Sequence, residues 1–290
     1  MNIPPVAALE IGTAHVRVLV GEAREDGHVT ISGMGEVPSR GVRKGEVVEF
    51  DLALESVRSA LHDAEERSPV KIGEVHLLVS GGEMLSMINR GSAPVHDSSE
   101  IQQEDIHKCL ETARAVSLPT GRQLIHSIAQ RYYIDDRHAV IDPQGMEGVK
   151  LSVDMLLLHG LRNRLRNTAK VVRSVPIEIR HVAFSGFCAS LSSLTPEQKE
   201  RGVLLIDMGG GTTDFVVYAR NAIAWAGSLP VGGDHVTNDI THGLQVSKQQ
   251  AEQLKESCGN ALVDLSLRGQ KISVPIELGV KDQFVPITDL

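Results

Sequence analysis

A glycine-rich segment in the second half of the chain constrains the fold more than any other: residues 204–218 read LLIDMGGGTTDFVVY. Two apolar runs typical of strands, ending at Ile206 and resuming at Phe215, enclose Asp207, three glycines and two threonines. So many glycines between two such runs fit a tight strand–turn–strand hairpin. Glycines let backbone N–H groups point at an anion, and threonine hydroxyls add donors. The pattern predicts a phosphate-binding loop, with residues 203–206 as a buried strand.

A second segment repeats this plan near the N-terminus, where residues 9–22 read LEIGTAHVRVLVGE. An apolar run leads to Glu10, Gly12 and Thr13, and alternating valines follow. Two similar hairpins far apart in the chain predict duplicated halves that face each other across a phosphate. Neither hairpin is a Walker A loop, since no Gly-Lys-Ser/Thr follows the glycines. Asp207 is placed to hold Mg²⁺ directly or through water.

Composition narrows the class of protein. The 290 residues are enough for two domains with real cores, and the formal net charge of −8 argues against a nucleic-acid partner. The three cysteines, Cys109, Cys188 and Cys258, lie far apart without a CxxC, which indicates a reducing cytosol. No run approaches the ~18 apolar residues of a membrane span.

The remaining patterns predict alternating strands and helices. Asp51 is a plausible N-cap for a helix whose apolar stripe reaches Ala64. Residues 83–160 read as a small, self-contained α+β insertion, and the basic helix 161–173 reads as a solvated surface in preference to a lipid-binding patch. The other predicted strands are 28–38, 74–80, 84–89, 123–134, 151–159, 177–183, 222–231 and 271–276, and the other predicted helices are 103–116, 187–194, one opening at Asp234, and one from Ser247 to Gly259.

The two acidic-Gly-Thr hairpins resemble the phosphate-1 and phosphate-2 loops of the actin, Hsp70 and sugar-kinase superfamily. Within it, the chain resembles the FtsA family of actin-like bacterial cell-division proteins in collinear order over essentially its whole length. The segments that carry the resemblance are 35–48, 83–160, 142–151, 204–214 and 229–240, the last including GGDHVTNDI.

That resemblance implies an α/β, actin-like fold of ribonuclease H-like duplicated halves with a small α+β insertion of the 1C (SHS2) type. It assigns 1–82 plus 161–202 to domain 1A, 83–160 to 1C, 203–231 to the start of 2A and 232–290 to part of 2B. The rest of 2A and the amphipathic membrane helix that ends family members are expected to be absent, as in a shortened gene or a fragment.

The resemblance also implies ATP and Mg²⁺ as cofactors. Glu252 and Lys255, three apart on one helix face, match nucleoside contacts, although the pair fits an ordinary exposed ion pair equally well. The residues matched to the phosphates are Gly12 and Thr13 in the first loop, Gly209, Gly210, Gly211, Thr212 and Thr213 in the second, and Gly232, Gly233 and Asp234 beside them; Asp207 and Glu10 match the metal site.

Three departures from the family pattern bear on chemistry. The first loop has Glu10 where an aspartate is usual, and the extra methylene shifts the carboxylate by more than ~1 Å. Ser185–Gly186 replaces a Glu-Pro pair whose acid lies where the attacking water is oriented. No Gly-Gly adenosine turn occurs after Gly233. The binding glycines remain, so the expectation is nucleotide binding with slow or absent hydrolysis, at most a weak ATPase.

By resemblance, the chain helps to assemble the divisome at the septum and tethers the FtsZ ring to the membrane. The implied partners are the FtsZ C-terminal tail, further copies in actin-like protofilaments and other divisome proteins through domain 1C, with no nucleic acid. The implied location is cytoplasmic, at the inner face of the cell membrane at the division site. Two alternatives are a pilus-assembly actin-like adaptor and a small-molecule kinase of the superfamily, which would need a catalytic aspartate between the halves.

Overall fold

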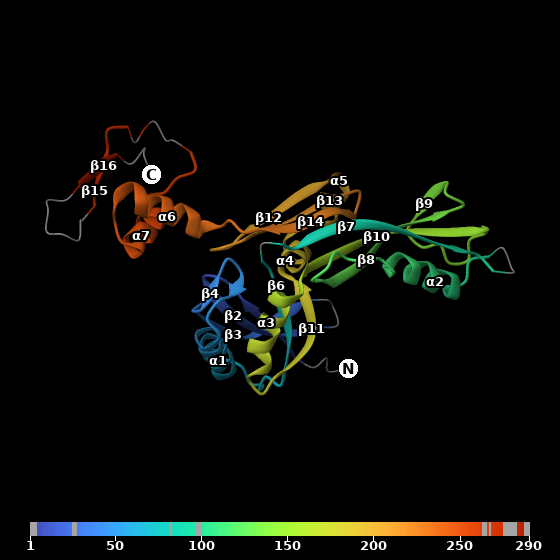
Figure 1. The fold of residues 1–290 in the computed structure, drawn as a ribbon, viewed down its shortest axis with the longest axis horizontal. Helices are drawn as coiled ribbons and strands as arrows, with labels where there is room; N and C mark the ends of the chain where they lie inside the picture. The colour runs from blue at the N-terminus through green and yellow to red at the C-terminus, as the bar shows by residue number, and fades with distance from the viewer. Residues whose placement is uncertain are drawn as a thin grey trace. The chain divides into compact units, whose positions relative to one another are not determined.

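The computed structural model describes residues 5–24, 28–81, 83–96, 100–262, 266, 268–274 and 283–286. The chain divides into two compact units, Met1–Pro230 and Val231–Leu290, which are described separately (Figure 1). The first unit contains two large sheets, and the second contains two helices and a short hairpin.

The first sheet carries the N-terminal hairpin. Its strand order is β11-β6-β1-β2-β3, in which β1, β2 and β3 are antiparallel neighbours and β6 and β11 join in parallel. Helices α1 and α3 pack against this sheet and against each other, as Figure 1 shows. The bounds are β1 Val6–Ile11, β2 His15–Ala23, β3 Val29–Pro38, α1 Phe50–Glu66, β6 Glu74–Val79, α3 Arg162–Arg173 and β11 Glu178–Phe184.

Helix α1 buries the predicted apolar stripe, including Val57, Leu61 and Ala64. The predicted N-cap is wrong. The helix begins at Phe50 after Glu49, whose side chain makes no capping hydrogen bond. Asp51 lies inside the first turn, where its negative charge interacts favourably with the helix dipole.

The second sheet has the order β12-β13-β14-β7-β10-β8-β9, and all its neighbours are antiparallel. Helix α2 packs on β7 and β10. The bounds are β7 Leu85–Pro94, α2 Gln103–Arg114, β8 Arg122–Ile134, β9 His138–Val140, β10 Lys150–Leu161, β12 Val203–Met208, β13 Thr213–Ala219 and β14 Ala222–Leu229.

The insertion has its own core, in which Ile101, Cys109 and Met155 are fully buried. The insertion was predicted to be self-contained, but its strands do not form a separate sheet. Strand β7 pairs with β14 at Leu85 and Gly227, and Ser228 N donates to Met84 O at 3.1 Å. The inserted strands therefore continue the sheet that carries the second glycine loop, because β7 offers an unpaired edge to β14.

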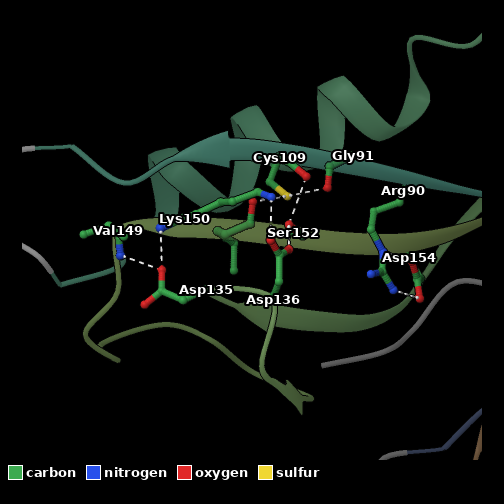
Figure 2. Close-up of polar contacts among 11 residues, drawn as sticks. Arg90, Gly91, Cys109, Asp135, Asp136, Val149, Lys150, Ser152 and Asp154 are labelled. Carbon is green, nitrogen blue, oxygen red and sulfur yellow. Dashed lines mark hydrogen bonds and ion pairs between the residues drawn. The ribbon is translucent and has the colours of Figure 1, made fainter.

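Polar contacts hold the register of the inserted strands (Figure 2). The Arg90 guanidinium donates to both carboxylate oxygens of Asp154, at 2.6 and 2.7 Å, across β7 and β10. Asp135 Oδ1 accepts the backbone N–H groups of Val149 and Lys150, both at 3.0 Å. Asp135 adopts a left-handed conformation with φ 49°, which places its side chain for this contact.

Strand β12 forms where it was predicted but is not buried. Val203 and Leu205 pack on the core of the first unit. Leu204 and Ile206 point the other way and are 54% and 59% exposed. Within the described residues of the first unit, no further layer covers that face of the sheet.

The first unit also contains two short strands between β3 and α1, and two short helices that link β11 of the first sheet to β12 of the second. They are β4 Val42–Arg43, β5 Glu46–Val47, α4 Ser185–Ser193 and α5 Pro196–Arg201. Phe184 N donates to His126 Nε2 at 2.9 Å, which joins the end of β11 to β8. Among the described residues, no helix combines the length and apolar character needed to cross a membrane.

The second unit comprises α6 Gly233–Leu244, α7 Lys248–Cys258, β15 Lys271–Val274 and β16 Gln283–Pro286. Ser247 caps α7 as predicted, its Oγ accepting from Gln250 N at 3.3 Å, and Gly259 follows the helix end. A small core of Val246 and Ala251 forms between the helices. The last two residues of the predicted strand 271–276 lie outside the described residues.

Candidate functional site: two glycine loops around one pocket

The two glycine loops have the same closing hydrogen bond. The first loop joins β1 to β2, and Gly12 N donates to His15 O at 3.0 Å. The second joins β12 to β13, and Gly209 N donates to Thr212 O at 2.8 Å. In both cases a glycine N–H closes onto the carbonyl three residues later, as expected for a duplicated hairpin.

The structure brings the two loops into contact, which confirms the predicted juxtaposition. A Cβ at Gly211 would lie 2.6 Å from Thr13 Oγ1 and 2.9 Å from Lys44 Cα, and one at Gly210 would lie 3.1 Å from Ala14 Cβ. Only glycine therefore allows this approach at position 211, because real Cβ contacts are not this short.

A pocket of about 300 Å³ lies at the junction of the loops. Thr13 Oγ1 accepts from Gly45 N at 2.9 Å, which anchors the first loop. No described residue accepts a hydrogen bond from the backbone N–H groups of Ala14, Gly210 or Gly211. Unsatisfied N–H groups on adjacent loops are suited to binding an anion. Two predicted residues of the second loop do not line the pocket: Gly211 packs against Thr13, and Thr213 is buried at the start of β13. The predicted residues that do line it are Glu10, Gly12, Thr13, Asp207, Gly209, Gly210 and Thr212.

Three carboxylates line this pocket: Glu10, Asp207 and Asp214. Burial is the main cause that raises the pKa of Glu10, and the charges of Asp207 and Asp214 raise it further, against the lowering effect of Arg17. Arg17 Nη1 lies 3.7 Å from Glu10 Oε2. The Asp207 carboxylate makes no hydrogen bond or ion pair with another described residue.

Asp214 is the principal site residue that the sequence analysis missed. It is 4% exposed, and three serine hydroxyls from different elements donate to it. Ser80, after β6, donates to Oδ1 at 2.7 Å, Ser185 in α4 donates to Oδ2 at 2.5 Å, and Ser228 in β14 donates to Oδ1. Burial raises the pKa of Asp214, although these hydrogen bonds act in the opposite direction.

The acidic residue after GGGTT was the available signal for Asp214, because it follows a phosphate loop directly. The serines carry no such signal, since they are single residues far apart in the chain. Ser185, where the resemblance led us to expect an acid, donates its hydroxyl to Asp214, and Asp214 is the residue of this pair that lines the pocket.

The remaining predicted residues gather within the second unit, at the start of α6. Lys255 Nζ lies 2.6 Å from Glu252 Oε1 and donates to Thr237 Oγ1 at 3.1 Å, while Thr237 donates to Glu252. Lys255 Nζ also lies 3.5 Å from Gly233 O. Gly232 precedes the helix as its N-cap, and Asp234 pairs with Lys248 at 3.5 Å. Glu252 and Lys255 thus form an i,i+3 ion pair. Their role in nucleoside binding stays a prediction.

The donor set of the pocket fits a magnesium ion held mainly through Asp207. Mg²⁺ is usually held by one or two carboxylates together with phosphate oxygens and water. Asp207 is available for this, whereas Glu10 is paired with Arg17. Across the described residues, no group of three or more His, Cys, Asp and Glu side chains could hold a metal without such phosphate ligands.

Comparison with known proteins gives the family. The model of the SHS2 domain inserted in FtsA matches residues 81–159, and the model of cell division protein FtsA matches residues 204–290. Cell division protein FtsA of Pseudomonas aeruginosa is 34% identical over 270 residues, which is 93% of this chain. The chain belongs to the FtsA family. It spans 64% of the length of that relative.

Solved structures show the fold. A chain of a PilM–PilN type IV pilus biogenesis complex superposes with a TM-score of 0.62 at 15% identity, over 87% of this chain and 69% of that one. MreB 5 of Spiroplasma citri, in a crystal structure bound to AMPPNP, gives a TM-score of 0.51 at 14% identity, over 100% of this chain and 73% of that one. The predicted actin-like α/β fold with an SHS2 insertion is therefore confirmed.

Proposed function

We propose that this FtsA-family chain binds ATP, with its phosphates in the pocket between the two glycine loops and with Mg²⁺ held by Asp207. The observation that carries the proposal is the contact between the loops, which brings the unsatisfied N–H groups of Ala14 and Gly210 to the lining of one pocket. The actin-like fold supports it, because the related structure of MreB 5 is bound to an ATP analogue.

We propose that hydrolysis is slow or absent. A general base must accept a proton from the attacking water, and Ser185 replaces the acid expected for that role. Asp214 is the nearby alternative, but three hydroxyls already donate to its oxygens. Its lone pairs are engaged in holding the pocket wall, which leaves little capacity to activate water.

Replacing Asp207 with alanine tests the nucleotide site. Isothermal titration in the presence of Mg²⁺ is expected to show ATP and ADP affinity reduced by at least about tenfold, or ~1.4 kcal/mol, through loss of the metal contact. Asp51→Ala removes an exposed carboxylate from α1 outside the pocket and is expected to bind as the wild type does. Equal affinities for the Asp207→Ala and wild-type proteins would remove the metal role of Asp207.

We further propose that the chain acts in cell division as an actin-like adaptor. It would tether FtsZ to the inner face of the membrane at the division site, associate with further copies in protofilaments and contact other divisome proteins through its SHS2 insertion. Membership of the FtsA family and the intact insertion core support this role. We also propose the domain assignment that the resemblance predicted, in which residues 232–290 form part of 2B.

Binding of an FtsZ C-terminal tail peptide tests the partner. Short tails bind in apolar grooves that carry a few charges. Helices α6 and α7 of the second unit pack together, but among the described residues their hydrophobic core has just two buried members, Val246 and Ala251. Fluorescence anisotropy is therefore expected to show weak, saturable binding of a labelled tail peptide and none of a scrambled one. A protein extended to the length of its curated relatives should bind more tightly; an extended protein that ignores the tail would contradict the FtsZ role.

A further inference from the structure

A row of alternating charges crosses three strands beside the pocket. Arg17 on β2 is the register partner of both Glu10 on β1 and Glu36 on β3. Its Nε donates to Glu36 Oε2 at 3.0 Å, and its Nη1 lies 3.7 Å from Glu10 Oε2. Directly opposed residues of antiparallel strands lie on the same face, so the strand register itself places this arginine between two carboxylates.

This row extends into the phosphate pocket. Arg17 and Glu10 both line the pocket, and Glu36 does not. Of the residues that line it, Arg17 is the only lysine or arginine in the described part of the chain. A guanidinium carries five N–H donors, and the two contacts above leave part of this fork available to a phosphate.

We infer that Arg17 is a built-in cation of the pocket, which neutralises Glu10 and binds a nucleotide phosphate. Glu10 is then not a magnesium ligand, and nucleotide binding depends less on Mg²⁺ than it would without this arginine. This inference rests on the proposed nucleotide site. It adds that Arg17 determines how strongly ATP affinity depends on Mg²⁺.

The charge of the pocket supports this assignment. Three carboxylates around a polyphosphate need a compensating cation, and an arginine remains charged at every physiological pH. The Glu10 side chain is partly buried, which raises its pKa and makes the paired arrangement preferable to an isolated charge. For Glu10 to ligate Mg²⁺, its contact with Arg17 would have to be given up.

A purely structural role explains the row less well. The Arg17 side chain is 44% exposed, and ion pairs between exposed groups typically contribute only ~0–1 kcal/mol. The small gain in stability does not account for the position of the guanidinium in the pocket, whereas recognition of a phosphate does.

ATP affinity measured with saturating Mg²⁺ and again in EDTA tests the inference. The ratio of the dissociation constant in EDTA to that with Mg²⁺ is expected to be at least about tenfold larger for Arg17→Ala than for the wild type, a difference readily resolved by titration. Arg17→Lys, which keeps the charge but not the fork, should lie between them. Arg40→Ala removes an exposed arginine with a single ion pair to Glu55 outside the pocket and should behave as the wild type does. Equal ratios for wild type and Arg17→Ala would overturn the inference.

Mn²⁺ binding without nucleotide, followed by the electron paramagnetic resonance signal of free Mn²⁺, provides a separate reading. Arg17→Ala is expected to bind Mn²⁺ more tightly than the wild type, and Glu10→Gln in the same background should remove the gain. Unchanged Mn²⁺ affinity in Arg17→Ala would show that Arg17 does not keep metal from Glu10. If no protein in the series binds ATP, the proposed nucleotide site fails, and the Mn²⁺ measurement still decides whether Arg17 excludes metal.

Discussion

Gly211→Ala is expected to weaken ATP binding by at least about 100-fold, or ~2.7 kcal/mol. The added Cβ would lie 2.6 Å from Thr13 Oγ1, 2.8 Å from Thr13 Cγ2 and 2.9 Å from Lys44 Cα. Two of these neighbours belong to the first glycine loop and the third is backbone, so the loops must move apart. Displacing binding groups by about 1 Å is enough to produce a loss of this size.

Isothermal titration checks this result, with thermal unfolding to confirm that the variant is folded. Gly73→Ala is the matched control, because no atom lies within 4 Å of the position of its Cβ. It should leave both affinity and folding unchanged. Wild-type affinity in Gly211→Ala would mean that close approach of the loops is not needed for binding.

Asp214→Ala is expected to lower the free energy of unfolding by about 3 kcal/mol, since it removes the acceptor of two buried hydroxyls, Ser185 and Ser228, and of the partly buried Ser80 hydroxyl. The serines come from the end of β6, from α4 and from β14, so Asp214 joins both sheets of the first unit at one point. Denaturant unfolding measures the loss. Asp207→Ala is the control: this neighbouring carboxylate is exposed and its removal should change stability by less than about 0.5 kcal/mol. Coincident unfolding curves for Asp214→Ala and wild type would contradict the structural role.

The effect of Asp214 should also depend on pH. Burial raises the pKa of this carboxyl above its ordinary value of 3.8 in the folded state. The folded protein therefore holds the proton more tightly than the unfolded chain does. The resulting stabilisation is complete below the ordinary value and is lost as the pH rises through the raised pKa. The difference in unfolding free energy between wild type and Asp214→Ala is expected to be largest in acid and smaller at neutral pH.

The sequence alone determined the local parts of the fold and the site. The glycine loops, the strands that flank them and the Ser247 cap of α7 depend on residues within a few positions of one another, and these patterns act through local sterics and hydrogen bonding. The repeated acidic-Gly-Thr pattern also predicted that the two loops meet. Together with the inserted segment, these patterns were enough to indicate the FtsA family.

Only the tertiary structure decided which groups surround the pocket. Asp214 receives hydroxyls from residues far apart in the chain, and Arg17 meets Glu10 through the register of β1 and β2. The exposure of Leu204 and Ile206, in a run that reads as buried, depends on whether another layer covers β12. Burial and cross-strand contacts are set by the packing of distant elements, so no local pattern could specify them.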